Sequence, residues 1–344
     1  MQVAELLKKD LRERFKTLYE KAMRYREMVR KAMFDVLSES DSVLFKAARH
    51  LIEAGGKLVR PVLFLLACEF VGGDPEKLVL AAAGAEFGHV ASLIHDDIID
   101  EDEVRRGVPA VHVKFGTPIA ILAGDLLIFK AFQMLALTAD RGVPLDRIVR
   151  ALKISTESSV AVDEGEAMDV LMGSRVDVGL SEYFRMIELK TAEAFRVGLM
   201  LGALLGGGSE EEMEALSRYG LLIGIAFQIQ DDILGVFGSE EVVGKPVADV
   251  LKGRRNFLIV HALEKGPKHV RERLLELLGD PGDISKEELE EIRAMLVEAG
   301  SLDEARRLVE ELTEEAKRTI EGLGRPEARK ALMEMADFLK TRVY

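Results

Sequence analysis

Apolar residues recur along most of the chain with the three-and-four spacing of an amphipathic helix, and no segment alternates in the way a half-buried strand does. Clusters of glycine and proline, such as Gly72-Gly73-Asp74-Pro75, interrupt this pattern and favour turns. Neither a linker nor a short repeat divides the chain. We therefore predict an all-α fold in which residues 1–344 form a single large helical domain. The expected helices cover residues 3–37, 43–54, 76–104, 118–137, 145–172, 181–205 and 210–237, and three or four more lie within residues 268–342.

The predicted helix over residues 76–104 is apolar on almost every side, which is typical of a helix buried in a core. Six carboxylates fill the eight positions that begin at Asp96. Asp96 and Asp100 lie one turn apart, with Asp97 beside them, so their like charges repel. A divalent cation removes that repulsion, and oxygen ligands of this kind suit Mg²⁺ with bound water and a substrate phosphate. The alternative is a solvated acidic helix end, and a second acid pair in another apolar helix, Asp231-Asp232, argues against it.

Several cations lie where an anion would need them. Gly55-Gly56 precedes Lys57 and Arg60, which share a face at the start of the next predicted helix. A glycine pair, a helix N-terminus and two cations match an anion site, although a surface Lys and Arg around a helix cap is the commoner meaning of this pattern alone. Lys190 lies in an apolar segment and needs a partner, for which an anion is one candidate. His89 lies two turns before the acid block on nearly the same face, although a lone core histidine is usually only packed.

Composition narrows the partners and the location. The formal net charge of −13 argues against a general nucleic-acid binder, whereas a small anion needs only a local basic cluster. Cys68, the single cysteine, excludes an intrachain disulfide and agrees with a reducing cytoplasm; its apolar neighbours predict buried packing. The N-terminus is charged within a few residues, unlike a signal peptide, and no uninterrupted apolar run reaches the ~18 residues of a spanning helix. We expect a cytoplasmic protein without a membrane span.

Taken together, the motifs point to one family. The first acid motif, His95-Asp96-Asp97-Ile98-Ile99-Asp100, is followed by Arg105-Arg106-Gly107, and the second is Phe227-Gln228-Ile229-Gln230-Asp231-Asp232. Gly55-Gly56-Lys57 with Arg60, Lys190-Thr191 and Gly244-Lys245 complete the set. In this order, over residues 55–256, the motifs resemble those of the trans (all-E) isoprenyl diphosphate synthases, and of geranylgeranyl diphosphate synthase in particular. One Asp-Asp-x-x-Asp motif is weak because terpene cyclases share it, but the ordered set is specific.

The resemblance implies a fold, a reaction and a cofactor. The expected protein is a helical enzyme of the isoprenoid synthase type, a fold that is usually homodimeric. It would have a central cavity, with the two acid motifs facing each other across the mouth. This prenyltransferase of isoprenoid biosynthesis would be Mg²⁺-dependent. An allylic diphosphate ionises, the double bond of isopentenyl diphosphate attacks the cation, and a proton is lost. Magnesium and cationic side chains neutralise the leaving diphosphate, and a deep apolar cavity keeps water from the carbocation.

The resemblance also implies roles for individual residues. The magnesium ligands would be Asp96, Asp100 and Asp231, supported by Asp97 and Asp232. The allylic diphosphate would be bound by Arg105, Lys190 and Lys245. The isopentenyl diphosphate would be bound by Lys57, Arg60, His89 and Arg106. Thr191 and Gln228 would line the reacting centre, where their dipoles stabilise the carbocation.

The second motif departs from the family pattern at one position. Gly235 stands where its last Asp is usual, which removes a carboxylate but leaves Asp231. The basic pair that follows reads Arg254-Arg255-Asn256 instead of Lys-Lys-Thr and keeps its charge.

Product length in this family depends on side chains one and two turns before the first motif, where an aromatic ring stops the growing tail. The residues here are small, and they are Ala91, Ser92, Gly88 and Gly84. This argues against a fifteen-carbon product and places the floor at Phe87, or at Phe129 or Phe132 in the helix after Pro118. The segment from Gly165 to Asp169 is similar to short-chain and geranylgeranyl enzymes. We expect geranylgeranyl diphosphate, with geranylfarnesyl or a longer polyprenyl diphosphate as the alternative.

Other classes of protein share part of these features. A class I terpene cyclase uses the same ionisation but needs no isopentenyl site, so the Gly-Gly-Lys and Arg-Arg-Gly elements argue against it. A non-catalytic partner subunit would have lost acid-motif residues, and only one position departs here. A plain helical scaffold with acidic surfaces does not explain matched motifs in order.

Overall fold

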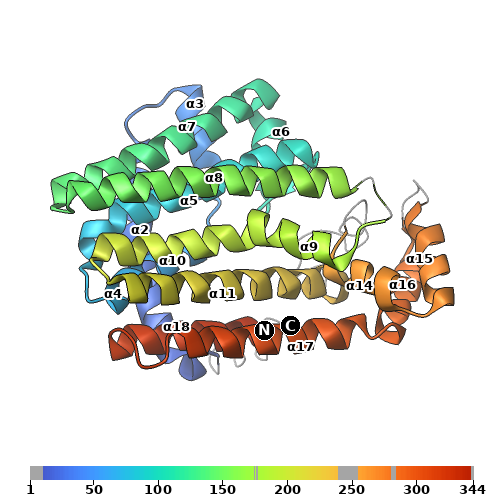
Figure 1. Ribbon diagram of the computed structural model, residues 1–344. Coiled ribbons are helices and arrows are strands. Elements are labelled where there is room, and N and C mark those ends of the chain that lie inside the picture. Colours follow the sequence, from blue (N-terminus) through green and yellow to red (C-terminus); the bar gives the residue numbers. More distant parts are fainter. Residues whose placement is uncertain (1–10, 174, 176, 239–254, 280–283, 342–344) are drawn as a thin grey trace. The chain divides into compact units, whose positions relative to one another are not determined.

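The computed structural model describes residues 11–341 except 174, 176, 239–254 and 280–283 (Figure 1). Helices account for nearly all regular structure in this part of the chain, which confirms the all-α prediction. The helices are α2 (Lys16–Leu37), α3 (Val43–Glu53), α4 (Val59–Phe70), α5 (Pro75–Ile99), α6 (Val111–Phe115), α7 (Thr117–Leu137), α8 (Leu145–Gly173), α9 (Leu180–Ile187), α10 (Glu193–Gly206), α11 (Glu210–Phe237), α14 (Phe257–Lys265), α15 (Lys268–Gly279), α16 (Lys286–Glu298), α17 (Ser301–Thr319) and α18 (Pro326–Lys340). A 3₁₀ turn, η1 (Thr138–Arg141), and a π-helical turn, η2 (Glu188–Ala192), join them.

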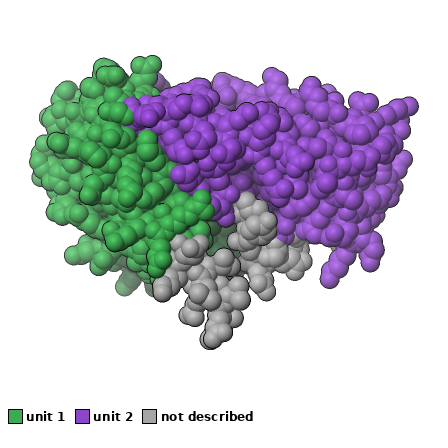
Figure 2. Space-filling model, turned by 90° about the horizontal axis from the view of Figure 1, so that it is seen from below, with its two compact units in different colours: residues 1–155, 198–216, 322–334 green, residues 156–197, 217–321, 335–344 purple. Residues whose placement is uncertain are grey.

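The chain forms two compact units, which Figure 2 colours separately. Unit 1 contains residues 1–155, 198–216 and 322–334, and unit 2 contains residues 156–197, 217–321 and 335–344. The division falls inside α8, α10, α11 and α18, so each of these helices contributes residues to both units. That the whole chain is one domain stays a prediction.

In unit 1, α5 packs against α2, α4 and α7. Its small residues make these contacts close: a Cβ atom on Gly84 would lie 2.9 Å from the carbonyl oxygen of Ala131 on α7. Phe87 is fully buried in the same helix, and Cys68 on α4 is buried as predicted. The apolar character that predicts a core helix therefore reflects neighbours on several sides of α5.

In unit 2, one apolar core joins α9, α11, α14, α15, α16 and α17. The rings of Tyr183 on α9 and Phe257 on α14 lie 5.9 Å apart within it. Helix α14 begins where the Asn256 side chain accepts a hydrogen bond of 3.0 Å from the Ile259 amide, as an N-cap residue does. This cap fixes the start of α14 directly beside the second acid motif.

The helix predicted for residues 76–104 ends at Ile99, and a short hairpin follows it. Strand β1 (Val104–Arg105) pairs with antiparallel β2 (Val108–Pro109). Arg106 and Gly107 both have positive φ, of 55° and 76°, as the two central residues of a type I′ hairpin turn require. The sequence shows no strand pattern here, because strands of two residues are too short for alternation to be visible.

The predicted helix over residues 181–205 is interrupted in its middle. Helix α9 ends at Ile187, η2 follows with π-helical hydrogen bonds, and α10 begins at Glu193. The π-helical turn, residues 188–192, contains Lys190 and Thr191 but no glycine or proline, so its composition does not predict an interruption of the helix. Single π-helical turns are frequent at functional sites, where they re-aim side chains.

Three helical segments of the described chain are long and apolar enough to cross a membrane by length and composition. They are Pro75–Ile99, Thr117–Arg141 and Glu210–Phe237, and 56%, 33% and 67% of their apolar windows are buried. More than half of the window is buried in the first and third segments, whereas only a third of it is buried in the second. The absence of a membrane span stays a prediction.

Candidate active site

The first acid motif, in unit 1, divides its carboxylates between two environments. Asp97 is fully buried and accepts a hydrogen bond of 2.6 Å from the Arg105 Nε atom; Asp102 lies 3.1 Å from Arg105 Nη2. Asp96 is half-buried, and Asp100, which ends α5 as its C-cap, is exposed. Asp97 thus fixes the arginine, while Asp96 and Asp100 remain accessible to a ligand.

The charge state of Arg105 follows from this arrangement. Burial alone lowers the pKa of its guanidinium, but the hydrogen bond and the negative charge of Asp97 outweigh burial and leave the pKa raised. Arg105 therefore carries its full charge within a cluster of carboxylates.

A second cluster in unit 1 contains Arg60 and His89. The Arg60 Nη1 atom lies 3.2 Å from His89 Nε2. Burial, followed by the positive charges of Arg60, Arg106 and Arg105, lowers the pKa of His89 well below its usual value. His89 is therefore neutral, and its Nε2 atom accepts the hydrogen bond because a guanidinium can only donate. Lys57, which precedes this cluster in the glycine loop, is exposed.

Lys190 in unit 2 lies on η2 and is held by two carboxylates of α8. Its Nζ atom lies 2.7 Å from Glu166 and 2.6 Å from Asp169. Burial lowers the pKa of Lys190, but these two charges outweigh burial and leave it raised. Gly165 permits the approach, because a Cβ atom there would lie 2.3 Å from the Lys190 amide nitrogen. The lysine is thus charged and fixed, and its partners come from the segment around Asp169.

The second acid motif, on α11 in unit 2, also separates its two carboxylates. Asp231 is half-buried, whereas Asp232 is 9% exposed and accepts hydrogen bonds from three donors. The donors are the Tyr183 hydroxyl at 2.6 Å, the Phe257 amide at 2.7 Å and Gln228 Nε2 at 2.9 Å. Burial raises the pKa of Asp232 to about 6, although these three donors act in the opposite direction. Asp232 thus positions its neighbours, and Asp231 remains more accessible.

Gln228 extends this network toward Lys190. The Thr191 hydroxyl donates a hydrogen bond of 2.8 Å to Gln228 Oε1, so Thr191, Gln228, Asp232 and Tyr183 form a continuous chain. Of the candidates in unit 2, the structure therefore joins Thr191, Gln228 and Asp232 through hydrogen bonds. Lys245, with Gly244, lies outside the described residues.

The chain-length candidates on α5 fall into two groups. Gly84, Phe87 and Ala91 are buried. Gly88 and Ser92 are half-buried, and a Cβ atom on Gly88 would meet no atom of the described residues within 4 Å. Phe129 on α7 is 70% exposed in the chain. Space for a side chain therefore exists beside Gly88, but not beside Gly84.

The accessible carboxylates are of the type that magnesium prefers. Asp96, Asp100 and Asp231 offer hard oxygen ligands, and Mg²⁺ commonly binds one or two protein carboxylates together with water and substrate phosphates. In the part of the chain that the structure describes, no group of three or more His, Cys, Asp or Glu side chains is arranged to hold a metal ion by itself. Asp96 and Asp100 in unit 1, and Asp231 in unit 2, are therefore each suited to bind magnesium together with substrate phosphates and water.

Sequence reasoning missed several residues that support these clusters. Asp102 and Tyr183 were not singled out, and Glu166 and Asp169 were noted only as part of a segment similar to short-chain enzymes. Each meets its partner through the tertiary fold or a turn, which spacing within one helix does not encode. Because Lys190 is a cation in an apolar segment, its need for a partner was the one usable signal.

Comparison with known proteins identifies relatives along nearly the whole chain. The polyprenyl synthetase family model matches residues 41–296. The short chain isoprenyl diphosphate synthase of Methanothermobacter thermautotrophicus is 42% identical, over 92% of this chain and 94% of that protein. The geranylgeranyl diphosphate synthase of Methanosarcina mazei is 40% identical, over 88% and 90%. The geranylfarnesyl diphosphate synthase of Aeropyrum pernix is 38% identical, over 79% and 85%. Among solved structures, geranylgeranyl pyrophosphate synthetase from Pyrococcus horikoshii has a TM-score of 0.87 and 36% identity, over 93% of this chain and 98% of that one.

Proposed function

Because the chain belongs to the polyprenyl synthetase family and is an isoprenyl diphosphate synthase, we propose that it condenses isopentenyl diphosphate with an allylic diphosphate. The arrangement around Asp97 supports this proposal most directly: one buried carboxylate fixes a charged arginine, with the half-buried Asp96 and the exposed Asp100 in the same motif. A diphosphate that leaves from carbon needs fixed positive charge around its oxygens, because its own negative charge grows as the bond breaks. The family and the motifs favour this reaction over terpene cyclisation.

The residues of unit 1 have distinct roles in this proposal. Arg105 binds the allylic diphosphate, and the buried Asp97 keeps its guanidinium in one orientation. Asp96 and Asp100 would be ligands of Mg²⁺, as would Asp231 of unit 2, and the ion would neutralise the charge of the diphosphate. The isopentenyl diphosphate is bound by Lys57, Arg60, His89 and Arg106. A neutral His89 suits this role, since it orients Arg60 without adding a further charge to the cluster.

The residues of unit 2 bind the allylic diphosphate and stabilise the carbocation that forms from it. Lys190, together with Lys245, contacts the allylic diphosphate. The carbonyl or hydroxyl oxygens of Gln228 and Thr191 stabilise the carbocation by their dipoles. Their mutual hydrogen bond and the anchor at Asp232 fix these dipoles before the charge develops, which is the condition under which electrostatic stabilisation is largest.

The product is proposed to be geranylgeranyl diphosphate, with geranylfarnesyl diphosphate as the second candidate. Small residues precede the first motif, and space is present beside Gly88. Relatives of similar identity carry both product names. The test is to incubate the purified chain with Mg²⁺, isopentenyl diphosphate and farnesyl diphosphate and to resolve the products by length. A single twenty-carbon product supports the proposal, a ladder to twenty-five carbons or more supports the second candidate, and no elongation with any primer contradicts both.

We also propose a cytoplasmic homodimer that uses the exposed apolar surface of α7 and α8. Large side chains are exposed on both helices, namely Ile121, Leu122, Phe129 and Leu137 on α7, and Leu145, Val149, Leu152, Val160 and Leu171 on α8. The α8 residues follow the helical period closely enough to form one stripe. A second copy of the chain would cover them. Cys68, a free buried thiol, agrees with a reducing compartment.

Replacing Phe129 by aspartate is expected to convert the dimer into monomer at micromolar concentration, because the charge would have to be buried against the partner. Sedimentation velocity measures the mass of the particle. The matched control is Val297→Asp on α16, which introduces the same charge at another exposed apolar position and should leave the mass unchanged. A Phe129→Asp variant that sediments as the wild type does would remove α7 from the interface.

Replacing Gly165 by alanine is expected to displace Lys190 and lower kcat/KM for the allylic substrate by about a hundredfold, because small misplacements of binding groups are costly. It should also lower the free energy of unfolding by about 1–3 kcal/mol through overpacking. Gly198→Ala on α10 is the control, since a Cβ atom there meets nothing within 4 Å in the described residues. Steady-state kinetics and urea unfolding distinguish the two variants, and equal kinetics in both would contradict the role of this contact.

A further inference from the structure

Glu86 is a buried carboxylate that none of the motifs includes. It lies on α5, is 2% exposed, and faces the arginines proposed to bind isopentenyl diphosphate. A carboxylate in this position costs free energy unless charged partners compensate for lost water. Its Oε1 atom lies 3.6 Å from Arg106 Nη2. Burial raises the pKa of Glu86, while Arg106 and then Arg60 oppose that rise, so both arginines act on this one group.

Arg106 is fixed by its surroundings at several points. Its backbone has a φ of 55°, which is costly for a residue other than glycine and persists only where neighbours hold it. Its Nη1 atom donates a hydrogen bond of 2.9 Å to the carbonyl oxygen of Leu51. Its guanidinium also lies against Gly56, where a Cβ atom would be 3.0 Å from Nη1. The second glycine of the Gly-Gly-Lys loop therefore makes room for Arg106, which links the two motifs physically.

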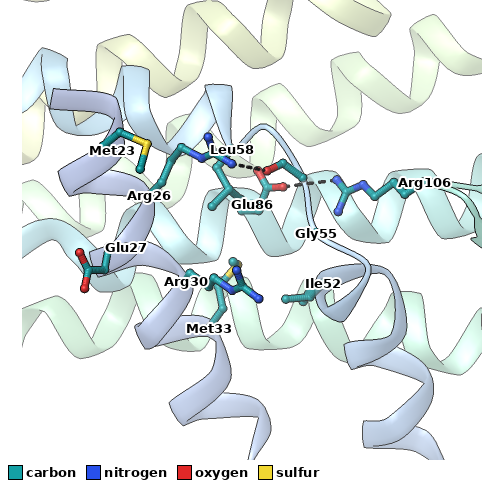
Figure 3. Close-up of a pocket in the computed structure, with 11 residues that line it drawn as sticks. Met23, Arg26, Glu27, Arg30, Met33, Ile52, Gly55, Leu58, Glu86 and Arg106 are labelled. Atoms are coloured by element: carbon teal, nitrogen blue, oxygen red, sulfur yellow. Dashed lines mark hydrogen bonds and ion pairs between the residues drawn. The ribbon is translucent and has the colours of Figure 1, made fainter. Parts of the chain in front are cut away.

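Figure 3 shows Glu86 and Arg106 at the wall of a cavity of about 370 Å³. Residues of α2 line the cavity from the other side, and one of them, Arg26, donates a hydrogen bond of 3.1 Å to the Gly56 carbonyl oxygen. The glycine loop is thus held between Arg26 and Arg106. Neither Lys57, Arg60 nor His89 lines this cavity, so a small molecule in it reaches the Glu86–Arg106 pair without meeting those three side chains.

Glu86 also acts on the second arginine through its position on α5. It lies three residues before His89, so both side chains project from one face of the helix. His89 is neutral and accepts a hydrogen bond from Arg60, whereas Glu86 supplies negative charge. Two guanidiniums near one site repel each other, and a buried carboxylate that acts on both offsets that repulsion.

From these contacts we infer that Glu86 is a positioning residue for isopentenyl diphosphate, one that orients Arg106 and balances the charge of Arg60 before the substrate binds. This inference rests on the proposed function, since it assumes that these arginines receive a diphosphate. A guanidinium has five N–H donors, and its contacts with Glu86 and Leu51 occupy only part of them. The orientation set by those contacts decides where the remaining donors point.

The first test is Glu86→Gln, which keeps the shape and removes the charge. We expect KM for isopentenyl diphosphate to rise about tenfold, with KM for the allylic diphosphate and kcat changed less than about threefold, because the arginines lose a nearby negative charge in a partly buried site. Glu69→Gln is the matched control, because Glu69 is another glutamate of unit 1 with limited exposure, hydrogen-bonded to Lys21 and Tyr25. A merely structural role would move both variants alike or raise both KM values together, and either result would overturn the inference.

The second test uses the cavity, and it remains informative if the Glu86→Gln variant folds poorly. Added formate is expected to lower the raised KM of Glu86→Ala for isopentenyl diphosphate toward the wild-type value, since a small carboxylate can enter beside Arg106. Chloride at equal ionic strength should not lower it. Glu86→Asp, which keeps the negative charge, should change this KM less than Glu86→Gln does. No recovery by formate in a folded Glu86→Ala variant would overturn the inference. Calorimetric binding of isopentenyl diphosphate alone separates this inference from the proposed function. Weaker binding by Glu86→Gln upholds the role of Glu86 even if the wild type does not elongate, and equal binding refutes it.

Discussion

Replacing Asp96 by asparagine is expected to lower kcat for elongation by about a thousandfold. Asparagine retains the shape and one oxygen ligand but loses the negative charge that binds a divalent cation. Asp96 is half-buried at the open end of α5, so the substitution leaves no buried charge unpaired. The residual activity should also require more Mg²⁺ to saturate. Initial rates over a range of Mg²⁺ concentrations measure both effects.

Two companion variants show whether the loss is specific to the metal site. Glu103→Gln removes an exposed charge from the same acid block and should leave kcat within about twofold. Asp97→Asn removes the buried partner of Arg105 and should lower the free energy of unfolding by about 3 kcal/mol, because it leaves a partly buried arginine without its main counter-charge. If Asp96→Asn retained wild-type kcat and Mg²⁺ dependence, the assignment of Asp96 as a ligand would fail.

The pairing of one buried with one accessible aspartate occurs in both acid motifs. Asp97 and Asp232 are buried and hydrogen-bonded to neighbouring side chains, whereas Asp96 and Asp231 are half-buried. In each motif the second aspartate therefore serves a positioning role through another group, Arg105 in unit 1 and Gln228 in unit 2. This division explains why two adjacent carboxylates are useful in spite of their repulsion.

Sequence reasoning predicted the long helices well because their signals are local. The predicted helix over residues 210–237 coincides with α11, and its start is fixed by the Ser209–Glu212 capping box, whose two reciprocal hydrogen bonds are present. Helix α7 begins at Thr117, one residue before the predicted start at Pro118. Periodicity, caps and glycine breaks all lie within a few residues of the boundary they set.

Features that depend on distant segments could not be predicted in this way. The π-helical turn at Lys190 accompanies a backbone approach to Gly165, which lies in another helix. The ion pair between Glu86 and Arg106 joins α5 to a hairpin turn. In both cases the motif residue was identified, but the residue that orients it was not, because orientation is set by tertiary contacts rather than by spacing.

Replacing Gly88 by phenylalanine is expected to shorten the main product by at least one five-carbon unit. Gly88 lies eight residues, and Ser92 four residues, before Asp96, so they continue along one side of α5 from the proposed metal ligand. Both are half-buried, although the neighbouring Phe87 and Ala91 are buried. A ring at this position would occupy space that the growing tail needs, and a tail blocked there is released earlier. Product chromatography after incubation with geranyl diphosphate measures the distribution.

Gly84→Ala is the matched control because it lies one turn further from Asp96 on the same helix. A Cβ atom there would collide with the backbone of α7, 2.9 Å from the Ala131 carbonyl oxygen, so the cost appears as a loss of stability of about 1–3 kcal/mol. Its product length should stay that of the wild type. An unchanged product in Gly88→Phe, with normal folding, would show that the tail does not pass Gly88. The floor would then have to be sought elsewhere, beginning with Phe132 and the exposed Phe129 of α7.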